Sequence, residues 1–164
     1  MRQYLSLYPV TPGPLFRWLG MMVTFIVLSE SIAMLLGRPL VPDSAVAAYQ
    51  KASSLPLLWM TVIVMAPVLE EMLFRGVLFE GIGRSRCGPV AALMITAFAW
   101  ALIHVQYGLF DRVTVFAAGI LLGTARMKTR SLYTTMAMHA VANLVAISET
   151  ALVVHFGSRY AWFI

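Results

Sequence analysis

Charged residues are scarce in this chain: only 12% of the 164 residues are Asp, Glu, Lys or Arg, whereas 60% are hydrophobic. Soluble globular domains carry roughly 25% charged residues, so this composition argues against an ordinary soluble enzyme. Cysteine is nearly absent as well. The single residue, Cys87, excludes an intramolecular disulfide and leaves no thiolate cluster to hold a metal ion. The mean hydropathy of +0.83 indicates a membrane protein.

What the chain has instead is a series of long apolar segments. A transmembrane helix needs about 20 mostly apolar residues, and five candidate segments are joined by mostly short connections. Their expected bounds are 15–36, 55–79, 89–107, 113–125 and 132–156. We therefore expect an all-α fold, a polytopic membrane helix bundle of about five transmembrane helices, with residues 1–164 forming a single membrane-embedded domain. The longest connection, 38–54, has room for a short interfacial helix.

The net charge of +5 lies at the ends of these segments and not along one soluble face, so it indicates topology and not nucleic-acid binding. With five crossings, the side of the N-terminus carries seven basic residues: Arg2, Arg17, Arg84, Arg86, Arg126, Lys128 and Arg130. The other side carries four: Arg38, Lys51, Arg112 and Arg159. The positive-inside rule then predicts a cytoplasmic N-terminus. We expect an integral membrane protein.

Some intramembrane residues have a structural explanation. Gly119 and Gly123 are four residues apart, a spacing that lets a second helix approach closely, and we expect them to serve packing. Glu30 lies near the end of its segment, where water or an arginine partner would account for its charge. Glu149 has no assigned role.

The second segment carries Glu70, Glu71 and Arg75 among residues apolar enough to cross a bilayer. A charge in hydrocarbon costs several kcal/mol unless it is paired or hydrated. On a helix, Glu71 and Arg75 fall on one face and are expected to pair, whereas Glu70 points elsewhere and is available for chemistry. Pro67 is expected to kink or to start the helix. On this stretch alone, a purely structural role for the charges stays open.

Two other segments contribute His104, and His139 with Asn143, the last two being four residues apart and so on one helical face. A desolvated glutamate beside histidines can activate water, and an imidazole with a carboxamide can stabilise an oxyanion. These groups suit peptide hydrolysis. They would also accept zinc, but the HExxH helix is absent, so we expect no metal and no cofactor. Residue counting spreads the groups over about 13 Å in depth, with His104 furthest out of line.

Three stretches then resemble the EExxxR, FxxxH and HxxxN motifs of the CPBP family, the CAAX-processing and bacteriocin-processing intramembrane proteases related to the Ras-converting endopeptidase. They are Glu-Glu-Met-Leu-Phe-Arg at 70–75, Trp-Ala-Leu-Ile-His at 100–104 and His-Ala-Val-Ala-Asn at 139–143. The resemblance covers residues 55–146, the expected catalytic core. Trp100 stands where the family pattern has Phe, and we expect this change to preserve the packing role.

The resemblance implies a metal-independent, glutamic-type intramembrane endopeptidase. The implied catalytic residues are Glu70 and His104, which activate water, and His139 and Asn143, which bind the oxyanion. The implied supporting residues are Glu71, Arg75 and Trp100.

The expected partners are membrane lipid and a membrane-anchored protein or peptide substrate, with no nucleic acid, and the oligomeric state stays open. The preferred substrate is the C-terminal membrane anchor or sorting signal of a bacterial surface protein, although a prenylated protein or a bacteriocin leader also stays open. The alternative is a non-proteolytic membrane scaffold or bacteriocin-immunity protein of the same fold, which would not need the motif residues. A channel or transporter is disfavoured because no inverted repeat is evident.

Overall fold

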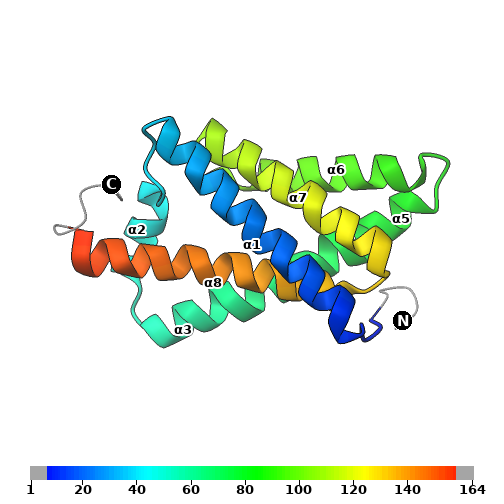
Figure 1. Cartoon of the computed structure of the whole chain (residues 1–164), viewed down its shortest axis with the longest axis horizontal. Coiled ribbons are helices and arrows are strands. Elements are labelled where there is room, and N and C mark those ends of the chain that lie inside the picture. The colour runs from blue at the N-terminus through cyan, green and yellow to red at the C-terminus, as the bar shows by residue number, and fades with distance from the viewer. Residues whose placement is uncertain (1–6, 158–164) are drawn as a thin grey trace.

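The computed structural model describes residues 7–157, and these form helices and connections with no strand among them (Figure 1). Arg2 and Arg159, which entered the topology prediction, lie outside this range. The helices are α1 (Pro12–Leu35), α2 (Asp43–Lys51), α3 (Leu55–Met60), α4 (Ala66–Glu71), α5 (Phe79–Gly83), α6 (Gly88–Ile103), α7 (Leu109–Thr129) and α8 (Leu132–Phe156). Two π-helical stretches, Thr61–Met65 and Met72–Leu78, join α3, α4 and α5 into one continuous helix, which we call the long helix.

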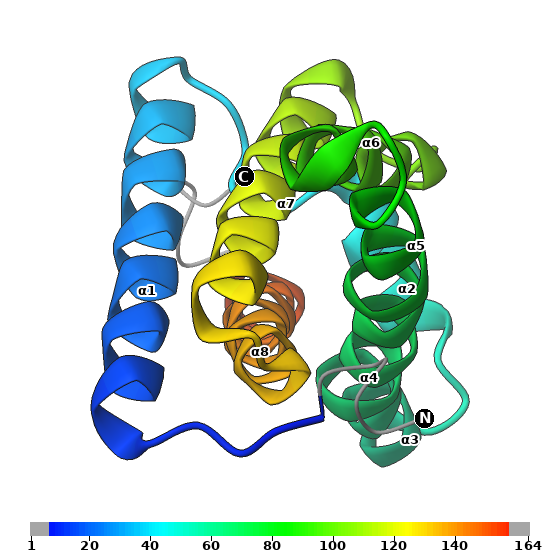
Figure 2. The ribbon, with the colours of Figure 1, turned by 90° about the vertical axis from the view of Figure 1, so that its right-hand side faces the viewer.

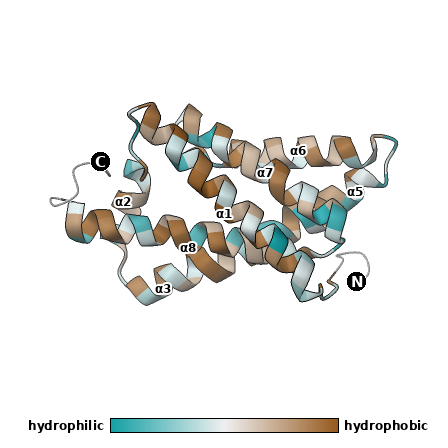
Figure 3. Cartoon of the chain, viewed as in Figure 1, coloured by the Kyte–Doolittle hydropathy of each residue, from teal (hydrophilic) through white to brown (hydrophobic). Residues whose placement is uncertain are grey.

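Three helices of the described range are long and apolar enough to cross a membrane: α1, the long helix and α8. The helix α6 is apolar but has only 16 residues. Large hydrophobic side chains such as Phe16, Leu35 and Val105 are exposed, and Figure 3 shows apolar residues along most of the helices. A surface of this kind suits lipid and not water. The polytopic helix bundle is therefore confirmed, and the number of five crossings stays a prediction.

The helices run between two ends of an elongated bundle. The start of α1, the α5–α6 connection and the α7–α8 connection lie at one end, whereas α2 and the start of α3 lie at the other (Figure 1). We call the first the basic end, because its elements carry Arg17, Arg84, Arg86, Arg126, Lys128 and Arg130. We call the second the α2 end. Seen from the basic end, α8 lies between α1 and the long helix (Figure 2), and this central position brings its side chains to the other helices.

Close packing of α6 on α7 depends on the two glycines. A Cβ atom added at Gly119 would lie only 3.0 Å from the Cβ of Ala97, and one added at Gly123 would collide with the side chain of Leu93. The expected packing role is therefore confirmed. The buried apolar core of the described bundle includes a cluster of Trp18, Met22, Phe74, Trp100, Leu122, Ala125 and Met138.

The third and fourth predicted segments had wrong bounds. The helix α6 ends at Ile103 and not at residue 107, and α7 extends over Leu109–Thr129 instead of 113–125. The carbonyl of Trp100 accepts a hydrogen bond from the ring of His104 at 2.7 Å, while the backbone N–H of His104 reaches the carbonyl of Ala101. This arrangement ends the helix, although the apolar run continues beyond it. The short helix expected within the first connection is present as α2.

Candidate active site

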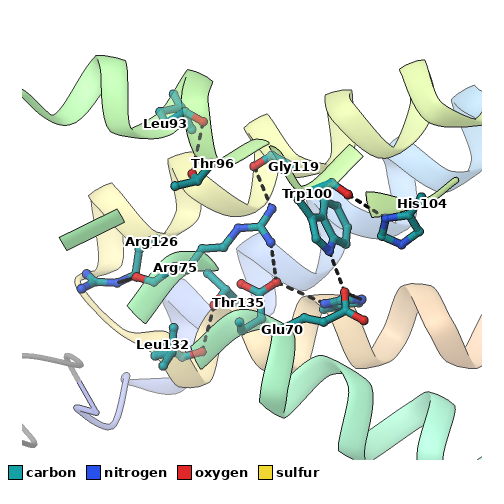
Figure 4. A network of polar contacts seen from close by, with 12 residues as sticks. Glu70, Arg75, Leu93, Thr96, Trp100, His104, Gly119, Arg126, Leu132 and Thr135 are labelled. Atoms are coloured by element: carbon teal, nitrogen blue, oxygen red, sulfur yellow. Dashed lines mark hydrogen bonds and ion pairs between the residues drawn. The ribbon is translucent and has the colours of Figure 1, made fainter. Parts of the chain in front are cut away.

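The long helix places Glu71 and Arg75 one turn apart on its inner face. Arg75 Nη1 donates to Glu71 Oε1 at 2.9 Å, and both side chains are fully buried. Arg75 Nη2 donates to the carbonyl of Gly119 at 3.3 Å. The Cζ atom of the guanidinium lies 4.5 Å from the centroid of the Trp100 ring (Figure 4). The predicted pairing is confirmed, and the close approach of α7 at Gly119 is what brings this carbonyl within reach.

Glu70, the preceding residue, points away from that pair. The indole Nε1–H of Trp100 donates to Glu70 Oε2 at 2.6 Å (Figure 4), and the glutamate side chain is 28% exposed. A hydrogen bond to a charged acceptor is stronger than one between neutral groups. The sequence prediction gave Trp100 a packing role that Phe would share, and this was incomplete because a phenyl ring has no donor. The sequence signal for this hydrogen bond was the residue type, since Trp has a ring N–H donor and Phe has none.

His139 lies between the two neighbouring glutamates. Its Nδ1 is 3.1 Å from Glu71 Oε1, and its Nε2 is 4.0 Å from Glu70 Oε2. A carboxylate only accepts, so Nδ1 carries a hydrogen and Nε2 is the nitrogen directed towards Glu70. The imidazole ring also meets the Trp100 ring edge to face at 5.2 Å, which fixes its plane.

His104 occupies the position directly after α6. Its Nδ1 must donate to the carbonyl of Trp100, which leaves Nε2 free to act as an acceptor or a base (Figure 4). The ring packs edge-on against Trp100 at 5.2 Å and stacks on Tyr107 at 5.4 Å. His104 lines the same cavity as the other predicted catalytic residues, so the depth mismatch from residue counting does not separate it from them.

Asn143 is held by a backbone carbonyl of the long helix, that of Val62. Within the π-helical stretch the N–H of Ala66 bonds to the carbonyl of Thr61, five residues earlier, so the next carbonyl, that of Val62, would need the N–H of residue 67. Residue 67 is Pro67, which has none. Asn143 Nδ2 donates to the Val62 carbonyl at 2.8 Å instead, and its second hydrogen stays available. Pro67 therefore neither starts the long helix nor interrupts it.

All four predicted catalytic side chains line one cavity of about 310 Å³. Its remaining walls are Ser44, Ala45, Ala48 and Tyr49 of α2; Leu58, Val62 and Ala66 of the long helix; Gln106 and Tyr107 after α6; and Ala146, Ile147 and Thr150 of α8. Sequence reasoning missed the contribution of α2 and of Tyr107. Burial raises the pKa of the Tyr107 hydroxyl, and the charges of Asp111 and Glu70 act in the same direction. This phenol therefore keeps its hydrogen.

Other titratable groups lie apart from this cavity. Glu149 of α8 contacts Glu30 of α1, so Glu30 has a carboxyl neighbour where an arginine was one expectation. His155 packs its ring against Tyr49 at 6.0 Å and does not line the cavity. Within residues 7–157 no three His, Cys, Asp or Glu side chains are grouped so as to hold a metal ion.

A comparison with protein-family models now gives this geometry a context. The model described as Rce1-like, type II CAAX prenyl endopeptidase, matches residues 52–145, more than half of the chain. The chain belongs to the Rce1-like family. Comparisons with curated proteins and with solved structures find no match. The Rce1-like family is a protease family, so this member is an endopeptidase of the CAAX type, and its apolar helices make it an integral membrane protein. The matched residues include all three motifs.

Proposed function

We propose that this Rce1-like protein is a glutamic-type intramembrane endopeptidase that hydrolyses a peptide bond of a membrane-associated protein without a metal ion. The observation that carries the proposal is the convergence of Glu70, His104, His139 and Asn143 on one cavity from three separate parts of the chain. A packing role alone would not require polar groups from the long helix, from the end of α6 and from α8 to face the same space.

In the proposed reaction, a water molecule in the cavity is activated by Glu70 and His104. Glu70 is the more exposed of the two neighbouring carboxylates, and Nε2 of His104 has no hydrogen in the neutral tautomer that its Nδ1 bond selects. One of these groups takes a proton from water as the oxygen attacks the carbonyl carbon. The same proton then passes to the leaving nitrogen as the C–N bond breaks, which regenerates the site.

The oxyanion formed by this attack is bound by His139 and Asn143. The amide of Asn143 has one hydrogen left after its bond to Val62. Nε2 of His139 donates only when both ring nitrogens are protonated, and the carboxylates of Glu71 and Glu70 on its two sides supply the opposite charge for that state. Each well-placed donor of this kind contributes roughly 3 to 4 kcal/mol to the transition state.

The remaining motif residues hold these groups in place. Arg75 and Trp100 contact each other as well as Glu71 and Glu70 respectively, so they orient both carboxylates. We propose as substrate the C-terminal membrane anchor or sorting signal of a surface protein, and a bacterial inner membrane as the location. The support for a peptide substrate in a membrane is family membership together with the apolar helices.

The test replaces the proposed base without changing its size. Glu70→Gln, assayed in detergent on a prenylated CAAX-type peptide and on a protein with a C-terminal transmembrane anchor, should lose about 100-fold or more in kcat. Its expression and melting temperature should match those of the parent. The matched control is Glu149→Gln, which changes an intramembrane glutamate outside the cavity and should keep activity. Near-normal turnover by Glu70→Gln would refute the role of Glu70.

A second test addresses the metal. The purified parent protein should contain well under one equivalent of zinc by elemental analysis and should keep cleaving in excess chelator, because the four proposed groups supply both the base and the oxyanion donors. Stoichiometric zinc, with activity lost to chelator and restored by zinc, would replace the glutamic mechanism with a metal-dependent one.

A further inference from the structure

The cavity extends from the proposed catalytic groups towards one end of the bundle. On α8, which runs from the basic end to the α2 end, its lining residues begin at His139 and continue to Thr150. On the long helix, which runs the opposite way, they extend from Leu58 to Glu70. On both helices the cavity therefore lies between the proposed catalytic groups and the α2 end. Its lining residues do not include any from the described connections 84–87 and 130–131 at the basic end.

Towards the basic end the same site is closed by buried side chains. Glu71 and Arg75 are fully buried beneath it, and Arg126 of α7 donates from Nε to the carbonyl of Arg75 at 3.1 Å (Figure 4). Arg126 also pairs with Glu80 at 3.1 Å, and its side chain is 4% exposed. A water molecule or a peptide entering from this end would have to disrupt a buried ionic network, which is energetically costly.

The charges at the two ends point to an orientation. The described part of the basic end carries six Lys and Arg residues, as defined above, whereas the described part of the α2 end carries three, Arg38, Lys51 and Arg112. The positive-inside rule places the more basic side in the cytoplasm. The α2 end then faces the opposite compartment.

We infer that the active site is entered from the non-cytoplasmic side, past α2, and that its substrate is a membrane-anchored protein whose soluble part lies outside the cytoplasm. Glu70 is 15 residues from Leu55, about 22 Å along the helix, so an unwound segment next to the anchor must reach in to about mid-membrane depth. The substrate clause rests on the proposed function, whereas the direction of entry does not.

The chain contains its own reporter for the orientation. Cys87, the single cysteine, is exposed in the α5–α6 connection at the basic end. In cells expressing the parent protein, a membrane-impermeant maleimide should leave Cys87 unlabelled until the membrane is permeabilised. In the variant Cys87→Ser with Gln106→Cys, the new thiol at the cavity wall should be labelled in intact cells. Cys87→Ser with Gln50→Cys, on the exposed side of α2, is the matched control for that end and should also be labelled.

Three labelling results would overturn the inference. Labelling of Cys87 in intact cells would place the basic end outside. Protection of both introduced thiols until permeabilisation would place the α2 end in the cytoplasm. Labelling at position 50 but at position 106 only after solubilisation in detergent would mean that the cavity opens to lipid and not to the aqueous compartment.

A cleavage assay tests the part of the inference that concerns the substrate. Two reporter proteins carry the same anchor, one with its soluble domain outside the cytoplasm and one with it inside. Cleavage of the first alone supports the inference, and cleavage of the second alone overturns it. If neither reporter is cleaved while the labelling pattern holds, the proposed function fails and the direction of entry stands.

Discussion

The two neighbouring carboxylates of the long helix occupy opposite environments. Glu71 is fully buried and contacts Arg75 and His139, whereas Glu70 is 28% exposed, contacts Trp100 and borders the cavity. One step of about 100° around a helix thus separates a fixed ion pair from a group that can meet water. The comparison supports the proposal that Glu71 positions the site and that Glu70 reacts.

Mutations of the buried pair Glu71 and Arg75 should lower the stability of the protein more than mutations at the cavity. Arg75→Ala leaves Glu71 buried without its cation, a change expected to lower the free energy of unfolding by about 3–5 kcal/mol. The expected measurement is a large fall in melting temperature and yield, with activity lost alongside. Glu71→Gln should act in the same direction.

An ion pair of the same spacing whose arginine is exposed provides the control. Arg84 and Glu80 are also four residues apart and joined at 2.7 Å, but Arg84 is 64% exposed. Because surface pairs contribute about 0–1 kcal/mol, Arg84→Ala should leave the melting temperature nearly unchanged. If Arg75→Ala proves as stable as Arg84→Ala, the buried pair has no structural role and the contrast between the two faces fails.

The hydrogen bond from Trp100 to Glu70, the carboxylate that borders the cavity, should matter for the rate of cleavage. Trp100→Phe keeps an aromatic ring but removes the donor to Glu70, a hydrogen bond to a charged group worth about 1.5–3 kcal/mol, or roughly 10- to 100-fold in rate. We expect kcat to fall by this factor with KM little changed. The control Trp18→Phe alters another buried core tryptophan, outside the cavity, and should keep kcat. Equal activity of the two variants would limit Trp100 to packing.

The sequence contained enough to predict the class of fold and the pairing within the long helix, because both follow from local periodicity. Apolar segments of membrane length predict helices, and a spacing of four residues predicts that Glu71 and Arg75 share a face. The family resemblance was confirmed by the match over residues 52–145. The roles of Glu70, His104, His139 and Asn143 stay predictions.

Other parts of the site depend on contacts that no local pattern encodes. The carbonyl left without a partner at Val62 arises from a π-helical stretch meeting Pro67, and only the tertiary structure brings Asn143 to it. The end of α6 is likewise decided by the ring of His104, within an apolar run that predicted a longer helix. For the same reason the wall formed by α2 was missed, since a short polar helix gives no sign of what it covers.

A substitution in the cavity wall formed by α2 should have the smallest of these effects. Ala48 of α2 lines the cavity, and Ala48→Leu adds three carbons to the space that is proposed to receive the substrate. A pocket change of this size is worth about 1 kcal/mol, so kcat/KM should fall roughly fivefold for peptides with bulky apolar residues next to the scissile bond. Peptides with glycine or alanine there should be cleaved as before, and the melting temperature should hold. The control Gln50→Leu adds an apolar side chain to the same helix outside the cavity wall and should leave both peptide classes unaffected. Ala48→Leu could instead lower kcat/KM equally for both peptide classes while Gln50→Leu leaves it unchanged. That result would mean that α2 supports the fold without selecting the substrate.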